Sequence, residues 1–394
     1  SAGRPPGMES MAATGTRLIA LAALTFLGSP AAPAVAETAA SAELAAATGT
    51  EIYRAACAAC HGADGRGAPA HQVAFEEALP DFTDCSFATR EPDADWLAVA
   101  HQGGPARAFS PMMPAFGEAL AEEQLLRALS HVRTFCADRR WPRGELNLPL
   151  ALFTEKAYPE DEVVWRTGMA VEGPGEVANR FVFEKRLGAR HQIEVIVPTA
   201  WREATPSDGA TGPDGSSHWS GGLGDVAVGA KRVLFHSLER GSILSLAGEV
   251  VLPTGDEEDG LGRGVTIFEP FVAYGQILPA DAFLQFQGGL ELPLDSDIAE
   301  EAFWRLAVGR TWSAGGWGRA VSPRVELRGA RELASGEDVL WDAVPQVQVS
   351  LSTRQHVLAN VGLRVPLNET AGRDTQVVIY LLWDWFDGGF FQGW

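Results

Sequence analysis

The feature that most constrains this fold is an alternation of apolar and polar residues that begins after Pro149 and runs to the end of the chain. In one segment Leu284 and Phe286 fall on one side, whereas Gln285 and Gln287 fall on the other. A period of two is that of a β-strand whose two faces meet different surroundings. About twelve such segments follow one another, at residues 161–172, 176–187, 190–204, 222–236, 241–254, 264–278, 282–294, 301–314, 319–333, 338–352, 355–368 and 375–390. The sequence therefore predicts a large all-β antiparallel region.

The connections between these segments alternate in length. Residues 187–189, 238–241, 279–281 and 353–355 are short turns, whereas 205–221 and 255–264 are longer and polar or acidic. An even strand number with short turns at one end and longer loops at the other is typical of bacterial outer-membrane barrels. The chain also ends on an aromatic residue, Trp394, which resembles the terminal signature of such barrels.

Charged and amide side chains at inward positions separate a barrel from a soluble β-sandwich. They are Arg305, Arg324, Glu326, Arg328, Gln346, Gln348, Asn360 and Arg364. A sandwich would alternate in the same way, but its interior is dry. A transmembrane barrel has a polar interior in which such groups can pair. We therefore expect a transmembrane barrel of about twelve strands over residues 161–394.

The sequence before the barrel contains a C-x-x-C-H motif, formed by Cys57, Cys60 and His61. In such a run each thiol can form a thioether to a haem vinyl group, and the turn presents the histidine to the iron. A zinc site would need a second C-x-x-C, and a thioredoxin-like dithiol would need a βαβ context; the sequence offers neither. We expect one covalently attached haem c, with His61 as an iron ligand.

The segments around this motif have helical patterns. They are residues 49–56, a helix with Asp93 as its N-cap that runs toward Gly103, and residues 122–135. Between the last two lies the loop Ser110–Phe116, which offers the thioether sulfurs of Met112 and Met113 between two prolines. A thioether is a suitable second axial ligand for haem iron.

Residues from about 48 to 136 resemble a small all-α class I monohaem cytochrome c. In that family the methionine directly before Pro-Ala-Phe is the distal ligand, which implies Met113 as the partner of His61. Met112 is the rival, because a shift of one residue would exchange the two. Three histidines are weaker rivals, namely His71, His101 and His131.

The N-terminal residues indicate export. Arg17 precedes the apolar run Leu18–Leu27, and residues 34–36 have the small-x-small form of a signal-peptidase site. A transmembrane helix would need roughly 20 apolar residues, twice the length of this run. Export into an oxidising compartment makes a disulfide between Cys85 and Cys136 possible, with two free buried thiols as the alternative.

These observations predict four parts: a signal peptide (1–36), a class I cytochrome c domain (45–137), a linker (138–160) and an outer-membrane β-barrel (161–394). The stretch 222–227, Gly-Leu-Gly-Asp-Val-Ala, resembles a strand of an outer-membrane transporter-like barrel family. The whole plan is similar to that of fused cytochrome–porins. The 31 basic and 51 acidic residues give a net charge of −20, which disfavours nucleic acid as a partner.

The resulting expectation is an electron-transfer protein held in the outer membrane, in contact with its lipid, with the haem domain facing the periplasm. Histidine and methionine ligation leaves no open iron position, so the pattern favours an electron carrier over a catalyst and leaves the question of an enzyme open. The expected partner is a periplasmic redox protein or a small soluble electron shuttle. Two alternatives remain: an outer-membrane channel for small or hydrophobic solutes with an accessory cytochrome domain, and a soluble periplasmic oxidoreductase subunit.

Overall fold

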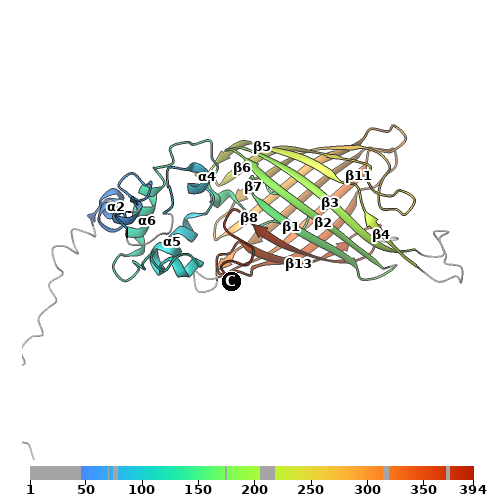
Figure 1. Ribbon diagram of the computed structural model, residues 1–394. Helices are drawn as coiled ribbons and strands as arrows, with labels where there is room; N and C mark the ends of the chain where they lie inside the picture. The colour runs from blue at the N-terminus through green and yellow to red at the C-terminus, as the bar shows by residue number, and fades with distance from the viewer. Residues whose placement is uncertain are drawn as a thin grey trace, which may run out of the picture. The chain divides into compact units, whose positions relative to one another are not determined.

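The computed structural model describes residues 46–69, 71–73, 79–173, 175–204, 218–313, 319–369 and 373–394. The expected signal peptide, residues 1–36, lies outside them. Helices occupy the first part of the described chain and strands occupy the part after residue 161 (Figure 1). Among the described residues, no helix is both long enough and apolar enough to cross a membrane.

The helical part is small and is built around two packed helices. Its described elements are α2 (Gly49–Ala56), α3 (Ala58–His61), α4 (Cys85–Ala88), α5 (Asp93–Gln102), the 3-10 helix η1 (Gly104–Arg107), α6 (Glu122–Val132) and the 3-10 helix η2 (Gly144–Leu146). Ile52 and Tyr53 of α2 are buried, as are Leu125, Leu129 and Val132 of α6. The helical spacing of these apolar residues brings them to one face of each helix, where the two helices meet.

The helix boundaries differ slightly from those expected from the sequence. Pro92, not Asp93, is the N-cap of α5, and Asp93 is its first helical residue. A carboxylate in the first turn still interacts favourably with the helix dipole. Helix α6 ends at Val132 and not at Phe135, because the last turn tightens: the amide of Phe135 donates to the carbonyl of Val132 at 3.1 Å.

In the described part of the chain, fourteen strands form one antiparallel sheet. They are β1 (Glu162–Ala170), β2 (Glu176–Leu187), β3 (His191–Ala204), β4 (His218–Leu223), β5 (Ala227–Ser237), β6 (Ser242–Val251), β7 (Ile267–Ile277), β8 (Ala282–Pro293), β9 (Glu301–Arg310), β10 (Trp312–Ser313), β11 (Ala320–Glu332), β12 (Leu340–Ser350), β13 (Val357–Pro366) and β14 (Gln376–Asp384). The short strands β4 and β10 pair only with β3 and β11. The other twelve form a closed ring, because β14 pairs with β1 and β9 pairs with β11.

The twelve long strands match the twelve segments expected from the alternation, and the predicted fold class is confirmed. The short strand β4 was not predicted, because residues 205–221 were expected to be a loop; residues 205–217 of that stretch lie outside the described chain. β4 contributes to the sheet through its register with β3, in which Trp201 lies opposite Gly221.

The outer face of the ring is apolar. Large exposed side chains on the strands include Trp165, Phe181, Phe183, Ile193, Val195, Val228, Leu246, Phe268, Val272, Val308, Val325, Val361, Leu363 and Ile379. Their neighbours in sequence point inward and are often polar and buried, among them Arg166, Glu184, Glu194, Lys231, Glu249, Gln285, Gln287, Arg324, Glu326, Gln346, Gln348 and Asn360. An apolar exterior around a polar interior is the pattern of a barrel surrounded by lipid.

The interior of the barrel is occupied by residues 147–161, which we call the luminal segment. Eleven of these fifteen residues are buried and the other four are half-buried, and their backbone bonds with inward side chains of several strands around the ring. The amide of Leu152 donates to Gln346 of β12 at 3.0 Å, and the carbonyl of Leu150 accepts from Tyr380 of β14 at 2.7 Å. The greater part of the stretch predicted as a linker (138–160), from residue 147 onward, therefore lies in the lumen.

Strands β3, β6 and β8 also form hydrogen bonds with the luminal segment. The amide of Glu155 donates to Gln287 of β8 at 3.0 Å, and the amide of Glu160 donates to Gln192 of β3 at 2.7 Å. Ser245 of β6 donates to the carbonyl of Ala157 at 2.5 Å. These bonds satisfy backbone groups that would otherwise be buried without partners.

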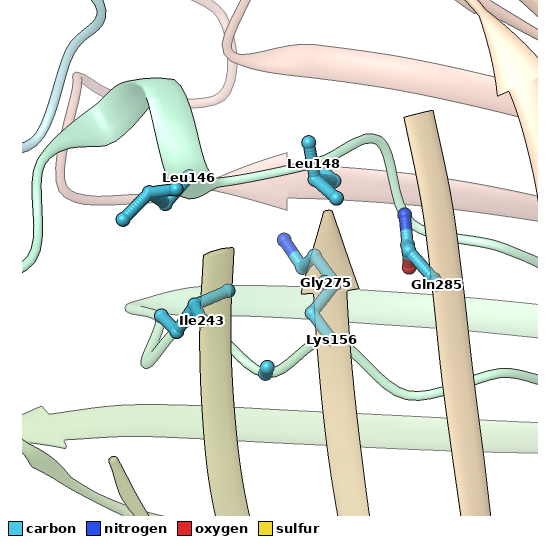
Figure 2. A pocket seen from close by; sticks show the side chains of 7 residues that line it. Leu146, Leu148, Lys156, Ile243, Gly275 and Gln285 are labelled. Carbon is cyan, nitrogen blue, oxygen red and sulfur yellow. The ribbon is translucent and has the colours of Figure 1, made fainter. Parts of the chain in front are cut away.

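A small pocket remains where the segment enters the barrel. Figure 2 shows the residues that line it, which come from η2, the luminal segment, β6, β7 and β8: Leu146, Leu148, Lys156, Ala157, Ile243, Gly275 and Gln285. The pocket leaves no room for a water-sized molecule. A Cβ added at Gly275 would lie 3.1 Å from the Cδ1 atom of Leu148, so the glycine allows this close packing.

Candidate haem site

The C-x-x-C-H motif forms a single turn at the end of α2. Cys57 is the C-cap of α2 and the N-cap of α3, and the amide of His61 donates to the carbonyl of Cys57 at 2.9 Å. Gly62 follows with a φ of 75°, a conformation that favours glycine and turns the chain away. The two thiols and the imidazole are therefore brought together by local structure alone.

Tyr53 holds this turn in place through a hydrogen bond. Its hydroxyl donates to the carbonyl of Gly62 at 2.7 Å, and its ring meets His131 and Phe135 edge-on, with centroids 5.2 and 5.3 Å apart. Burial raises the pKa of Tyr53 to about 12, so the hydroxyl stays protonated and remains a donor. The C-x-x-C-H turn is thus attached to the packed pair α2 and α6.

The surroundings of His61 fit a large flat apolar group. The Nδ1 atom of His61 is buried and has no hydrogen-bond partner in the described part of the chain, and burial lowers the pKa of this imidazole. A neutral imidazole is the form that binds a metal. The ring stacks on Phe82, with centroids 5.0 Å apart, and Phe82 in turn contacts Phe87 and Trp96. Cys57 and Cys60 are free thiols, so both can form thioethers.

Met113 lies in the loop between η1 and α6. Its carbonyl accepts from the amide of Gly104 at 3.0 Å, and its amide donates to the carbonyl of Ser110 at 3.3 Å. Gly104 is required for this loop, because a Cβ there would lie 2.1 Å from the Ser110 carbonyl oxygen. Met112 is 52% exposed, whereas Met113 is half-buried. The more enclosed methionine is therefore the one that the sequence resemblance assigns as the ligand.

The rival histidines have other surroundings. Nδ1 of His131 is 3.1 Å from the Thr50 hydroxyl, and its ring packs against Tyr53 of α2. His71 is exposed. The ring of His101 lies against Gly117, where a Cβ would be only 2.5 Å from the imidazole.

The other two cysteines are adjacent in the structure. The Sγ atoms of Cys85 and Cys136 are 2.03 Å apart, and their Cα atoms are 5.1 Å apart. A bond between them would join α4 to the residues that follow α6, across a sequence separation of 51. It would enclose α5 and the methionine loop within one covalent ring.

The barrel contacts the helical part at several points, among them two made by arginine side chains. Arg90 forms an ion pair with Asp161, at the end of the luminal segment, and its guanidinium lies 3.9 Å from the centroid of the Phe386 ring. Arg354, between β12 and β13, contacts the backbone of Arg107 and Ala108, just before the methionine loop. The sequence analysis identified neither arginine, because their partners are distant in sequence.

Comparison with known proteins agrees with this division of the chain. Residues 44–132 match the family described as Cytochrome C oxidase, cbb3-type, subunit III. No curated protein matches the sequence.

Solved structures resemble the barrel at low identity. The NanC porin is 9% identical over 56% of this chain and 97% of its own, with a TM-score of 0.38. The KdgM porin is 8% identical over 56% of this chain and 98% of its own, with a TM-score of 0.36. An outer membrane channel from Pseudomonas putida F1 is 13% identical over 56% of this chain and 93% of its own, with a TM-score of 0.37. The chain itself joins a cytochrome c-type domain, a type that binds haem, to a closed β-barrel of twelve long strands.

Proposed function

We propose that the protein is a haem c electron carrier, anchored in the bacterial outer membrane by its barrel. Cys57 and Cys60 hold one haem covalently, and His61 and Met113 are its axial ligands. The observation that carries this proposal is the single turn that presents both thiols and a buried, unpartnered imidazole nitrogen beside an aromatic wall. The haem, when bound, supplies reversible one-electron chemistry.

The chain's own residues position the ligands and limit access of water. Tyr53 holds the C-x-x-C-H turn through the Gly62 carbonyl, and Gly104 holds the Met113 backbone. Phe82, Phe87 and Trp96 supply an apolar surface, and Phe87 is 37% exposed. A group that covers this surface is stabilised by the loss of apolar area from water.

The apolar exterior of the barrel supports a position in the membrane, and the luminal segment supports a role as an anchor. A channel for small or hydrophobic solutes would need an open path. The backbone of residues 147–161 is bonded to inward side chains of β3, β6, β8, β12 and β14, which disfavours such a path.

The contacts of the helical part support a haem that faces the periplasm. Arg354, in the connection β12–β13, contacts residues 107 and 108. Arg190, in the connection β2–β3, and His236, beside the connection β5–β6, both contact residue 140. These connections are at the barrel end with short turns, which in bacterial outer-membrane barrels is the periplasmic end. The electron partner would then be a periplasmic redox protein or a small soluble shuttle.

Three measurements test this proposal. Mass analysis of the purified protein should show one haem bound through Cys57 and Cys60, and a redox titration should show one reversible one-electron step. Protease added to intact cells should leave the haem peptide attached, whereas permeabilised cells should lose it. Haem release from intact cells would contradict the orientation, and a haem-free protein from cells that mature c-type cytochromes would contradict the electron-transfer role.

A further inference from the structure

Three carboxylates meet inside the barrel, at a place that the haem proposal does not use. Glu155 comes from the luminal segment, Glu184 from β2 and Glu194 from β3. One carboxylate oxygen of each lies within 4.8 Å of the others. Glu184 and Glu194 are directly opposite in the register of β2 and β3, so their proximity follows from the sheet itself.

Glu184 and Glu194 are buried, Glu155 is half-buried, and one oxygen of Glu184 lacks a hydrogen-bond partner in the described residues. Glu184 is 3% exposed and Glu194 is 4% exposed. The Oε1 atom of Glu184 accepts from Gln192 at 2.8 Å, but its Oε2 atom is buried and has no hydrogen-bond partner in the described residues. A buried carboxylate oxygen without a donor is costly, and such a group calls for a missing partner.

The strand next to Glu194 leaves space for its carboxylate. Gly229 of β5 lies opposite Glu194, and a Cβ at this glycine would be 2.3 Å from the Glu194 Oε1 atom. Any other residue at position 229 would therefore displace the carboxylate from the cluster.

Nearby lysines do not balance the cluster. The Nζ atom of Lys156 pairs with Glu160 and with Glu162, the latter at 2.9 Å. The Nζ atom of Lys231 donates to the carbonyl of Lys156 at 2.9 Å. Lys156, Lys231 and Arg166 are near enough to interact with the cluster electrostatically, but in the described residues none of them forms an ion pair with Glu155, Glu184 or Glu194. Like charges directly opposite in a sheet are destabilising unless another charge lies between them.

We propose that Glu155, Glu184 and Glu194 bind a divalent cation of the oxygen-preferring class and that the ion fastens the luminal segment to the barrel wall. Two oxygens on one Ca²⁺ ion, each at about 2.3–2.6 Å from it, are at most about 5 Å apart, so the observed spacing suits this ion. Waters would complete the irregular coordination that Ca²⁺ accepts. The inference is independent of the haem.

The test uses the full-length, haem-loaded protein in detergent, stripped of metal with a chelator and titrated with Ca²⁺ by calorimetry. We expect one ion per chain and a higher melting temperature of the barrel when Ca²⁺ is present. Glu194→Gln and Glu155→Gln should each weaken binding at least about tenfold. Both changes nearly keep the side-chain shape and remove repulsion, so neither should prevent folding.

Glu269→Gln is the matched control, because Glu269 is an inward carboxylate on β7 outside the cluster. It should leave Ca²⁺ affinity unchanged. The proposal is overturned if the native protein binds no Ca²⁺, or if all three variants bind as the native protein does, which would indicate ions held by residual lipid. Equal weakening by Glu269→Gln would also overturn it, since the effect would then come from the general charge of the lumen.

Discussion

Arg354, in the connection between β12 and β13, donates from its guanidinium to the backbone carbonyls of Ala108 and Arg107, at 2.5 and 3.4 Å. The same guanidinium lies 4.4 Å from the centroid of the Phe109 ring. These residues directly precede the loop that carries Met113. A residue of the barrel therefore holds one end of the candidate ligand loop.

We expect Arg354→Ala to loosen this loop and weaken the bond between Met113 and iron. Methionine ligation raises the haem reduction potential, so the potential should fall. Loss of the charged hydrogen bonds should also lower the free energy of unfolding of the helical part by about 2 kcal/mol. A redox titration and a denaturant titration followed by haem absorbance measure the two effects. Arg240→Ala, in the connection between β5 and β6, is the control, and an equal change in both variants would contradict the argument.

The identity of the second iron ligand is tested by replacing each methionine of the loop. Met113→Ala should remove the weak absorbance band of iron–thioether ligation and lower the reduction potential. Met112→Ala should leave both unchanged, because this side chain is 52% exposed and its sulfur is not needed. The opposite result would identify Met112 as the ligand and contradict the assignment of Met113 that rests on the resemblance to class I cytochromes c.

The sequence predicts the long strands well because each of them repeats the same period of two. Gln285 and Gln287 are buried in the lumen, at 1% and 2% exposure, while Leu284 and Phe286, which alternate with them, face outward, as the alternation implied. Strand β4 (His218–Leu223) escapes this reasoning, since its sequence, HWSGGL, does not alternate.

The luminal segment could not be predicted, because no local period marks it. Leu152 is fully buried, and its amide is bonded to Gln346, which is 194 residues away. Glu155 likewise meets Glu184 and Glu194 only once the barrel has closed. The C-x-x-C-H turn is the opposite case, since Cys57 and His61 are joined by a local hydrogen bond and their proximity can be read from the sequence.

The proposed disulfide is tested by Cys85→Ala combined with Cys136→Ala. Removing a bond that closes a loop of 51 residues should lower the free energy of unfolding of the helical part by about 4 kcal/mol on the chain-entropy estimate. Haem content should not change, because neither cysteine belongs to the C-x-x-C-H motif. Alkylation of the unreduced native protein followed by mass analysis supplies the control, and two alkylated thiols would show that no bond exists.

The contact between the helical part and the C-terminal residues should depend on pH. The pKa of Glu91 is raised well above its usual range, first by burial and then by the carboxylates of Asp387 and Asp95. Burial and the neighbouring Asp384 also raise the pKa of Asp387. Between the usual and the raised pKa values the folded protein binds more protons than the unfolded chain, so stability falls as the pH rises through this window.

We therefore expect the melting temperature of the helical part to fall as the pH rises from about 5 to 8. Asp387→Asn removes one of the facing carboxylates and should make this fall shallower. Asp256→Asn, in an exposed loop, should change nothing. Identical slopes for the native protein and Asp387→Asn would refute the electrostatic cause.

The last prediction concerns conductance. A barrel of about twelve strands has a lumen that is wider than that of the small barrels filled by side chains and narrower than that of the porins. The luminal segment fills this space and is held by Glu326, which accepts from the Thr154 hydroxyl at 2.6 Å and from the amide of Phe153 at 3.2 Å. The native protein in planar bilayers should therefore show little steady ion current.

Glu326→Ala combined with Gln346→Ala removes acceptors for Phe153, Thr154 and Leu152, and each lost bond to the charged Glu326 costs about 1.5–3 kcal/mol. We expect the segment to leave its place part of the time, so that discrete openings appear in single-channel recordings. Val325→Ala is the control, because this side chain faces outward and is 55% exposed. A large, steady conductance in the native protein would show that the segment does not close the barrel, and would favour a solute channel over an anchor.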